Sequence, residues 1–287
     1  MAYEVKFVGK LQFTARTPVH VGGAREANVL YALRLRSLGR LLVPSSTWKG
    51  AFRAIAEKLA PSMPLSEIEK LAVEKVALSS EPKSSVKDLL EGFGRALRGE
   101  ETPPFKPDDV KRVLLSIGYS EEQLRAPENP AWMLVEYLAY HCPIGKLFGN
   151  QVRAGSVRFL DTLLTAQTQR RPGIGIGRKD LRVQEEKRIL YTVETTEAEV
   201  AVPLVMVGEV ERLGSPPARL LASTLEAFSE VGLSIGGRKS AGLGLLQLES
   251  AQFHLVKLAE DKGGVGLANP LKTPAVKLED FLKLLRG

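Results

Sequence analysis

The stretch VKFVGKLQFTAR, residues 5–16, alternates apolar and polar side chains. Its odd positions carry most of the apolar ones, namely Val5, Phe7, Leu11, Phe13 and Ala15. Alternation with a period of two is typical of a β-strand with one buried face. We therefore predict a half-buried strand whose outward face carries cations, and His20 follows it just past Pro18.

The segments on either side complete an alternating order of strands and helices. Residues 45–60 have apolar side chains at helical spacing, with Ser45 and Ser46 as candidate N-caps. Strands are predicted at 155–164, at 189–207 with a break, and from 243 onward, and Ser215 with Pro216 begins a second long helix. The order strand, helix, strand, strand, helix, strand predicts an α+β protein with a ferredoxin-like or RRM-like core.

Four segments follow from this order. Residues 1–60 form the first half of the core, and residues 61–145, with several periodic pieces between polar linkers, form a helical insertion. Residues 146–260 form the second half and include a cationic hairpin at about 165–195. Residues 261–287 are a Gly- and Pro-containing linker followed by a terminal helix.

Composition favours a polyanionic partner. The 287 residues carry a formal net charge of +7, with a sequence pI near 9.4. The single cysteine, Cys142, excludes an intrachain disulfide and a zinc site of several cysteines, so we expect a cytoplasmic protein. Cys142 and the three histidines show no metal-ligand spacing, so we expect no metal and no cofactor. No signal peptide or membrane span is evident, so we expect no association with a membrane.

The stretch LSIGGRKSAGLG, residues 233–244, concentrates glycine and positive charge. It nearly matches the phosphate-binding pattern of nucleotide-binding loops, but Arg238 intrudes before Lys239. The candidate contacts are Gly236, Gly237, Arg238, Lys239 and Ser240, and the alternative is a glycine turn with incidental charges. His20, Gly22 and Gly23 form a second candidate turn that lets a phosphate approach the backbone.

Two further cationic segments are candidates. The first segment is a helix start, where the helix dipole favours an anion, and its candidates are Ser45, Ser46, Lys49 and Arg53. The alternative is an ordinary capped and solvated helix start. The second segment is the cationic hairpin, whose charges suit binding to a sugar-phosphate backbone. Its candidate contacts are Arg171, Arg178, Lys179 and Arg182, and the alternative is a solvated surface hairpin without a ligand. No exposed aromatic pair is evident on the central strands, so backbone-directed RNA binding is favoured over base recognition.

Five stretches resemble the RAMP superfamily of CRISPR-associated proteins, especially the backbone subunits of type III (Csm/Cmr-like) effector complexes. They are TPVHVGG (17–23), LLVPSSTWKGAFRAIAE (41–57), KLFGNQVRAGSVRFLD (146–161), RPGIGIGRK (171–179) and IGGRKSAGLG (235–244). The resemblance implies an RRM-like core, guide RNA (crRNA) held along a filament of such subunits, and a thumb hairpin that displaces one nucleotide at intervals. It also implies target RNA, other RAMP subunits and copies of this chain as partners. His20, Ser46, Lys49 and Arg53 resemble guide-backbone contacts, the loop 236–240 resembles the family's RNA-contacting loop, and the segment 171–182 resembles the thumb.

The sequence departs from the family in two places. Target-cleaving members have an aspartate in the loop that here reads AREANVLYALRLRSLGR, residues 24–40, where Glu26 is the only acid. Gly145 stands where some relatives have a second cysteine for zinc. We therefore expect an RNA-binding subunit of an antiviral complex without its own nuclease activity. The alternatives are target cleavage through Glu26 and a divalent metal, guide processing with His20 as general base, or a module that contacts only protein.

Overall fold

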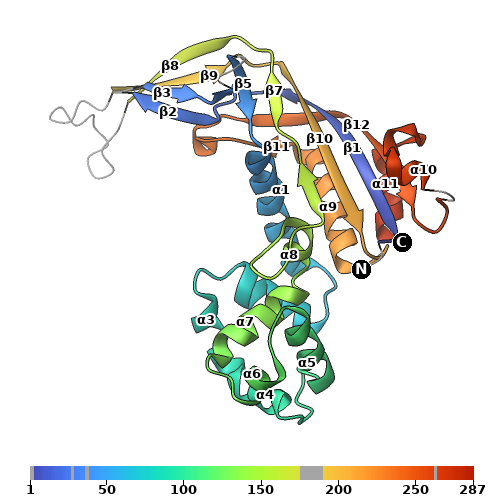
Figure 1. Ribbon diagram of the computed structural model, residues 1–287. Coiled ribbons are helices and arrows are strands. Elements are labelled where there is room, and N and C mark those ends of the chain that lie inside the picture. Colours follow the sequence, from blue (N-terminus) through green and yellow to red (C-terminus); the bar gives the residue numbers. More distant parts are fainter. Residues whose placement is uncertain (1–2, 27–28, 36–38, 175–189, 262–263) are drawn as a thin grey trace.

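A six-stranded antiparallel sheet forms the centre of the computed structural model, which describes residues 3–26, 29–35, 39–174, 190–261 and 264–287. The strand order is β11-β12-β1-β10-β6, and β13 pairs with β12 (Figure 1). The strands are β1 (Val5–Ala15), β6 (Val157–Phe159), β10 (Val200–Val210), β11 (Leu233–Ser234), β12 (Leu245–Lys257) and β13 (Ala275–Lys277). Strands β12, β1, β10 and β6 have the order of a ferredoxin-like fold, which confirms the predicted α+β class.

Strand β1 has the alternating burial that its sequence predicts. Its odd residues are buried and its even residues face outward, and it pairs along its whole length with β10 and β12. Helices α1 (Ser45–Leu59) and α9 (Pro216–Val231) pack against the sheet and against each other. The Phe52 ring of α1 lies 4.7 Å from Phe159 of β6 and 4.3 Å from Phe228 of α9, so one aromatic side chain joins the sheet to both helices.

A second sheet extends away from the core, at the upper left of Figure 1. Its order is β2-β3-β9-β8, with β3 and β9 parallel and β8 and β9 antiparallel. The strands are β2 (Gly22–Glu26), β3 (Val29–Ala32), β8 (Thr168–Ile174) and β9 (Leu190–Thr196). Strands β8 and β9 begin and end the predicted cationic hairpin, while Arg178, Lys179 and Arg182 lie outside the described residues.

The predicted strand at 155–164 is wrong as a single element. The chain leaves β6 after Phe159, and β7 (Thr162–Leu164) joins a third sheet with β4 (Arg34–Leu35) and β5 (Arg40–Val43). The Thr162 hydroxyl donates to the carbonyl of Pro203 (2.7 Å) and accepts from the Trp48 indole N–H (3.1 Å). These two hydrogen bonds anchor the turn that separates β6 from β7.

Helices fill the insertion, at the bottom of Figure 1, opposite the second sheet. The aromatic rings of Phe93, Phe105 and Tyr137 form its centre, with centroids 5.5–6.0 Å apart. Three of the short helices named below, α3, α6 and α8, were not predicted from the sequence. The elements are η1 (Ala60–Ser62), α2 (Glu67–Ala72), η2 (Val73–Ala77), α3 (Pro82–Ser85), η3 (Lys87–Leu89), α4 (Leu90–Leu97), α5 (Pro107–Ser116), α6 (Glu121–Arg125), α7 (Pro130–His141) and α8 (Pro143–Phe148).

The predicted linker after residue 260 contains short ordered elements, namely α10 (Val265–Ala268), η6 (Pro270–Lys272) and β13. The terminal helix α11 (Leu278–Arg286) is confirmed, and its Phe281 ring stacks 4.0 Å from Phe253 and lies 5.0 Å from Phe7. The end of the chain therefore belongs to the core. Among the described residues, no helix has the length and apolarity needed to cross a membrane.

Candidate nucleic-acid interface

The turn after β1 and the glycine-rich loop before β12 are bonded to each other. The Gly237 N–H donates to the carbonyl of His20 (2.8 Å), and the Gly244 N–H donates to the carbonyl of Pro18 (2.9 Å). Gly236 has φ +75°, and a Cβ placed on it would lie 2.3 Å from the His20 oxygen. Only glycine fits this close crossing of two backbones, so the two predicted segments form one structural unit.

The imidazole of His20 lies beneath this unit. The residue is 5% exposed, and its Nδ1 lies 2.8 Å from the carbonyl oxygen of Glu194 in β9. Beside it, the Val19 N–H donates to the Thr196 hydroxyl and the Thr196 N–H donates to the Val19 carbonyl, both at 2.9 Å. The geometry of His20 therefore fits a support between β9 and the two turns better than an exposed contact.

Glu194 joins β9 to the start of the third sheet. Its buried carboxylate accepts from the Ala32 N–H (2.9 Å) and from the guanidinium of Arg34 (2.5 Å). Burial by itself would raise the pKa of Glu194, but these hydrogen bonds and one from Thr168 outweigh it and hold the pKa below its usual value. The carboxylate is thus ionised and neutralised locally.

Arg238 has a conformation that is uncommon for a non-glycine residue, with φ 56°. Its guanidinium carbon lies 4.1 Å from the centroid of the Tyr191 ring in β9, within cation–π range. The same ring covers Gly173 of β8, where an added Cβ would lie 2.3 Å from it. Arg238 is half-buried on this ring, while the following Lys239 and Ser240 are exposed.

The start of helix α1 differs from the prediction in its cap. Pro44 is the N-cap, neither serine caps the helix by its side chain, and the Ser45 N–H donates to the carboxylate of Asp161 (2.6 Å). Asp161 thus already supplies an anion at this helix end. Lys49, one turn further on, is exposed.

Arg53 is occupied within the fold. Its Nε donates to Glu57 (2.8 Å) and its Nη1 to the carbonyl of Gly149 (3.0 Å), and the side chain is 31% exposed. These bonds attach α1 to the turn after α8. Of the two cations predicted on this helix face, Lys49 is available to a ligand and Arg53 is engaged.

Two grooves flank the first turns of α1. The glycine-loop groove, of about 550 Å³, contains Lys239 and is lined by Val21, Gly22, Leu33, Pro44, Ser46, Thr47, Gly50, Ala51, Gly236, Gly237 and Lys239. The β6 groove has a volume of about 610 Å³ and contains Lys49 and Arg158. It is lined by Ser45, Ser46, Lys49, Phe148, Gly149, Asn150, Arg153, Ala154, Gly155, Val157, Arg158 and Phe159. Both volumes fall in the range of ligand sites, roughly 300–1,000 Å³. Among the described residues, no acidic side chain lines either groove.

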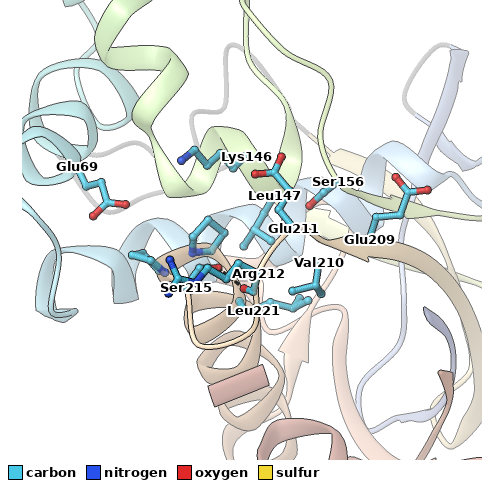
Figure 2. A pocket seen from close by; sticks show the side chains of 13 residues that line it. Glu69, Lys146, Leu147, Ser156, Glu209, Val210, Glu211, Arg212, Ser215 and Leu221 are labelled. Carbon is cyan, nitrogen blue, oxygen red and sulfur yellow. Dashed lines mark hydrogen bonds between the residues drawn. The ribbon is translucent and has the colours of Figure 1, made fainter. Parts of the chain in front are cut away.

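A third cavity, shown in Figure 2, has the opposite character. It is about 90 Å³ in volume and lies where the insertion meets β10 and the start of α9. Lys146 and Arg212 line it together with the acids Glu69, Glu209 and Glu211. Burial, with the nearby Arg153, lowers the pKa of the Lys146 ammonium, and Glu69 and Glu211 oppose this only in part.

The remaining candidates lie outside these grooves. Gly23, Glu26 and Arg171 are exposed on strands β2 and β8 of the second sheet. Cys142 is buried, which raises the pKa of its thiol. In the described part of the chain, no group of three or more His, Cys, Asp or Glu residues is placed to hold a metal ion.

Sequence reasoning missed four residues of this region, namely Asp161, Arg158, Tyr191 and Glu194. The first two lie in the stretch KLFGNQVRAGSVRFLD, where an outward Arg between Val157 and Phe159 is the only available signal. The others lie on β9, more than 150 residues from the turn that Glu194 supports. Their roles depend on contacts between distant segments.

Comparison with known proteins gives three findings. A chain of the cryo-EM structure of the type III-B Cmr-beta complex bound to cognate target RNA is similar to this one with a TM-score of 0.43 and 13% identity, over 88% of this chain and 61% of that chain. This chain therefore spans less than two thirds of that one. A search of curated proteins finds no match. The model of the RAMP superfamily matches residues 12–247, and because this range covers most of the sequence, the chain belongs to the RAMP superfamily.

Proposed function

We propose that this protein binds the backbone of a guide RNA as a subunit of a type III CRISPR effector complex in the cytoplasm, with target RNA and other RAMP subunits as partners. The observation that carries the proposal is the meeting of three predicted segments at one groove whose described lining contains no acidic side chain. Gly22, Ser46 and Lys239 come from separate parts of the chain and line it together. Membership of the RAMP superfamily and the matching motifs support the same function.

The groove suits a phosphate backbone better than a base. Glycine at positions 22, 236 and 237 lets a ligand approach the main chain, and the exposed Lys239 supplies charge without competition from a carboxylate. Contacts of this kind fix the position of a nucleic acid strand but carry no sequence information. A guide whose sequence varies requires binding of that type.

The proposal assigns no nuclease activity to this chain, because the loop 24–40 has no aspartate. Glu26, the acid of that loop, is exposed at the end of β2 and lines neither groove. The Nδ1–H of His20 donates to the carbonyl of Glu194, which leaves Nε2 as the acceptor of the ring, but the side chain is only 5% exposed, and this burial disfavours His20 as a general base acting on RNA. Regularly spaced cuts in a matched target RNA with Mg²⁺, lost on Glu26→Ala, would overturn this part of the proposal.

The test is the salt dependence of RNA affinity for Lys239→Ala, with Lys58→Ala as the matched control. Lys58 is an exposed lysine at the far end of α1 and lines neither groove. For a single strand, each lost phosphate contact should reduce the slope of log K against log salt by about 0.7. We expect Lys239→Ala to weaken binding about three- to tenfold at low salt with this smaller slope. Equal affinities for the two variants would contradict the proposed site.

A further inference from the structure

Resting on the proposed function, we infer that the β6 groove is a second phosphate-binding site, which receives the RNA strand after it crosses the start of α1 from the glycine-loop groove. Its ligand is the sugar-phosphate backbone, and its contacts are Lys49 and Arg158. The RNA-binding surface thereby extends along both sides of one helix.

The two grooves adjoin at Ser46, which lines both. Lys49 follows Ser46 by about one helical turn and lies on the β6 side. A strand held by Lys239 on one side therefore meets Lys49 as it passes over the first turns of α1. A nucleic acid strand carries charge along its whole length, and a groove whose described lining has no carboxylate favours it, although the Asp161 carboxylate accepts from the Ser45 N–H at the helix start.

Arg158 is the cation on the far wall of the β6 groove. Its side chain is 67% exposed, and its ion pair with Glu209 is long, at 3.6 Å. A long pair to an exposed guanidinium contributes about 0–1 kcal/mol, so Arg158 can exchange Glu209 for a phosphate, while the Glu209 carboxylate, which is 18% exposed, retains a hydrogen bond from Tyr3. Arginine also matches the geometry of phosphate oxygens with paired donors.

Asn150 and Arg153, which also line the groove, are engaged within the protein. Asn150 donates to the carbonyl of Ala139 (2.6 Å), and its oxygen accepts from the Val152 and Arg153 N–H groups (3.1 and 3.2 Å). Arg153 is 16% exposed and bonds to Glu211 at 2.5 Å. These contacts make the wall rigid and leave Lys49 and Arg158 as the cations that a ligand can reach.

The floor of the groove consists of closely packed backbone. Gly149 has φ +82°, and a Cβ on Gly155 would lie 2.6 Å from the Gly149 nitrogen and from the Leu147 oxygen. Side chains are therefore excluded where the two segments cross, and the groove stays open above them. An open floor between two cations fits an extended strand.

The experiment measures the affinity of the full-length protein for an unstructured uridine homopolymer of about 12 nucleotides, a length within the site sizes of single-strand-binding domains. Arg158→Ala is compared with Arg98→Ala in the insertion. The two arginines are matched, because Arg98 is 66% exposed and lies 3.8 Å from its partner Glu100. We expect Arg158→Ala to weaken binding about three- to fivefold with a salt slope smaller by about 0.7, and Arg98→Ala to match the wild type.

A second variant should act in the opposite direction. Glu209→Gln removes the carboxylate beside Arg158 without shortening the side chain, so it should tighten binding about twofold. Unchanged affinity for both Arg158→Ala and Glu209→Gln, with Lys239→Ala still weakened, would overturn this inference and leave the proposed function intact. Failure of the wild-type protein to bind the homopolymer would overturn the proposed function itself.

The remaining outcome separates RNA from protein as the occupant. If Arg158→Ala binds RNA normally but no longer co-purifies with its partner subunits, the β6 groove holds an acidic protein surface and the inference is wrong. The exposure of Arg158 makes misfolding of the variant a poor explanation for any loss. Superimposable thermal unfolding curves for the two arginine variants check this point.

Discussion

The grooves beside α1 and the cavity at the foot of α9 both contain cations, yet they have different surroundings. Lys49, Lys239 and Arg158 lie in grooves that no acidic side chain lines in the described part of the chain, whereas Lys146 and Arg212 share their cavity with three glutamates (Figure 2). The positive charge of the grooves is available to a ligand, and that of the cavity is largely balanced within the protein. The placement of carboxylates, more than the number of cations, therefore distinguishes a polyanion site from a structural cluster.

The two regions also differ in how they are assembled. The glycine-loop groove depends on backbone crossings that only glycine allows, such as the contact between Gly236 and His20. The cavity is lined by side chains of α2, α8, β10, α9 and the turn between β10 and α9. Substitutions that add a single carbon atom should therefore have large effects in the groove and small effects in the cavity.

The largest expected effect is that of Gly236→Ala. The new Cβ would lie 2.3 Å from the His20 oxygen at φ +75°, so the loop must move away from the turn after β1. We expect the free energy of unfolding to fall by about 3 kcal/mol and RNA affinity to fall with it. Urea unfolding and filter binding measure the two quantities.

Gly242→Ala is the matched control for this prediction. Gly242 has φ +78° in the same loop, but a Cβ there would meet nothing within 4 Å. It should cost only the conformational strain, about 1 kcal/mol, and leave RNA affinity close to that of the wild type. Equal losses for the two variants would mean that backbone strain, and not the crossing at His20, controls the groove.

The cavity is tested by Lys146→Met, which replaces a half-buried ammonium with an apolar side chain of similar length. We expect the free energy of unfolding at neutral pH to rise by about 1 kcal/mol, because the desolvation cost of the charge is removed. RNA affinity should not change. A marked loss of affinity would show that the cavity contributes to the polyanion site after all.

The pH dependence of this stabilisation has a definite sign. The pKa of Lys146 is lowered in the folded state, so the cost of its charge is fully present below that pKa. Between the lowered pKa and the ordinary value of 10.5, the unfolded chain retains a proton that the folded chain has released, and wild-type stability rises with pH. The advantage of Lys146→Met over the wild type should therefore shrink as the pH is raised from neutral toward this value.

Much of the fold could be predicted from local pattern. The alternation of residues 5–16 and the helical spacing after Ser45 correspond to β1 and α1, and Ser215 with Pro216 begins α9 as predicted. The break between β6 and β7 could not be predicted in this way. It depends on the Thr162 hydroxyl bonding to Pro203 and Trp48, which are distant in the sequence.

In the candidate site, too, some features follow from the local sequence and others depend on contacts with distant segments. Glycine and lysine positions such as Gly236 and Lys239 could be found from composition, because flexibility and charge are properties of the residues themselves. Availability is a property of the neighbours. Arg53 and Lys49 look equivalent in the sequence, but only the structure shows that Arg53 is bonded to Glu57 and Gly149.

The smallest expected effect concerns Tyr191. Arg238 beside the glycine-loop groove and Lys146 in the cavity are both half-buried cations, but their neighbours differ. Arg238 lies on an aromatic ring, which attracts the guanidinium without neutralising its charge, so its edge donors can still bond to a phosphate. Tyr191→Leu should remove this support and weaken RNA binding about two- to fivefold, as expected for a contact worth about 0.5–1 kcal/mol. Tyr191→Phe keeps the ring and should bind as the wild type does. If the two variants weaken binding equally, the Tyr191 hydroxyl and not the ring face positions Arg238, and an aromatic surface is not what keeps this cation available.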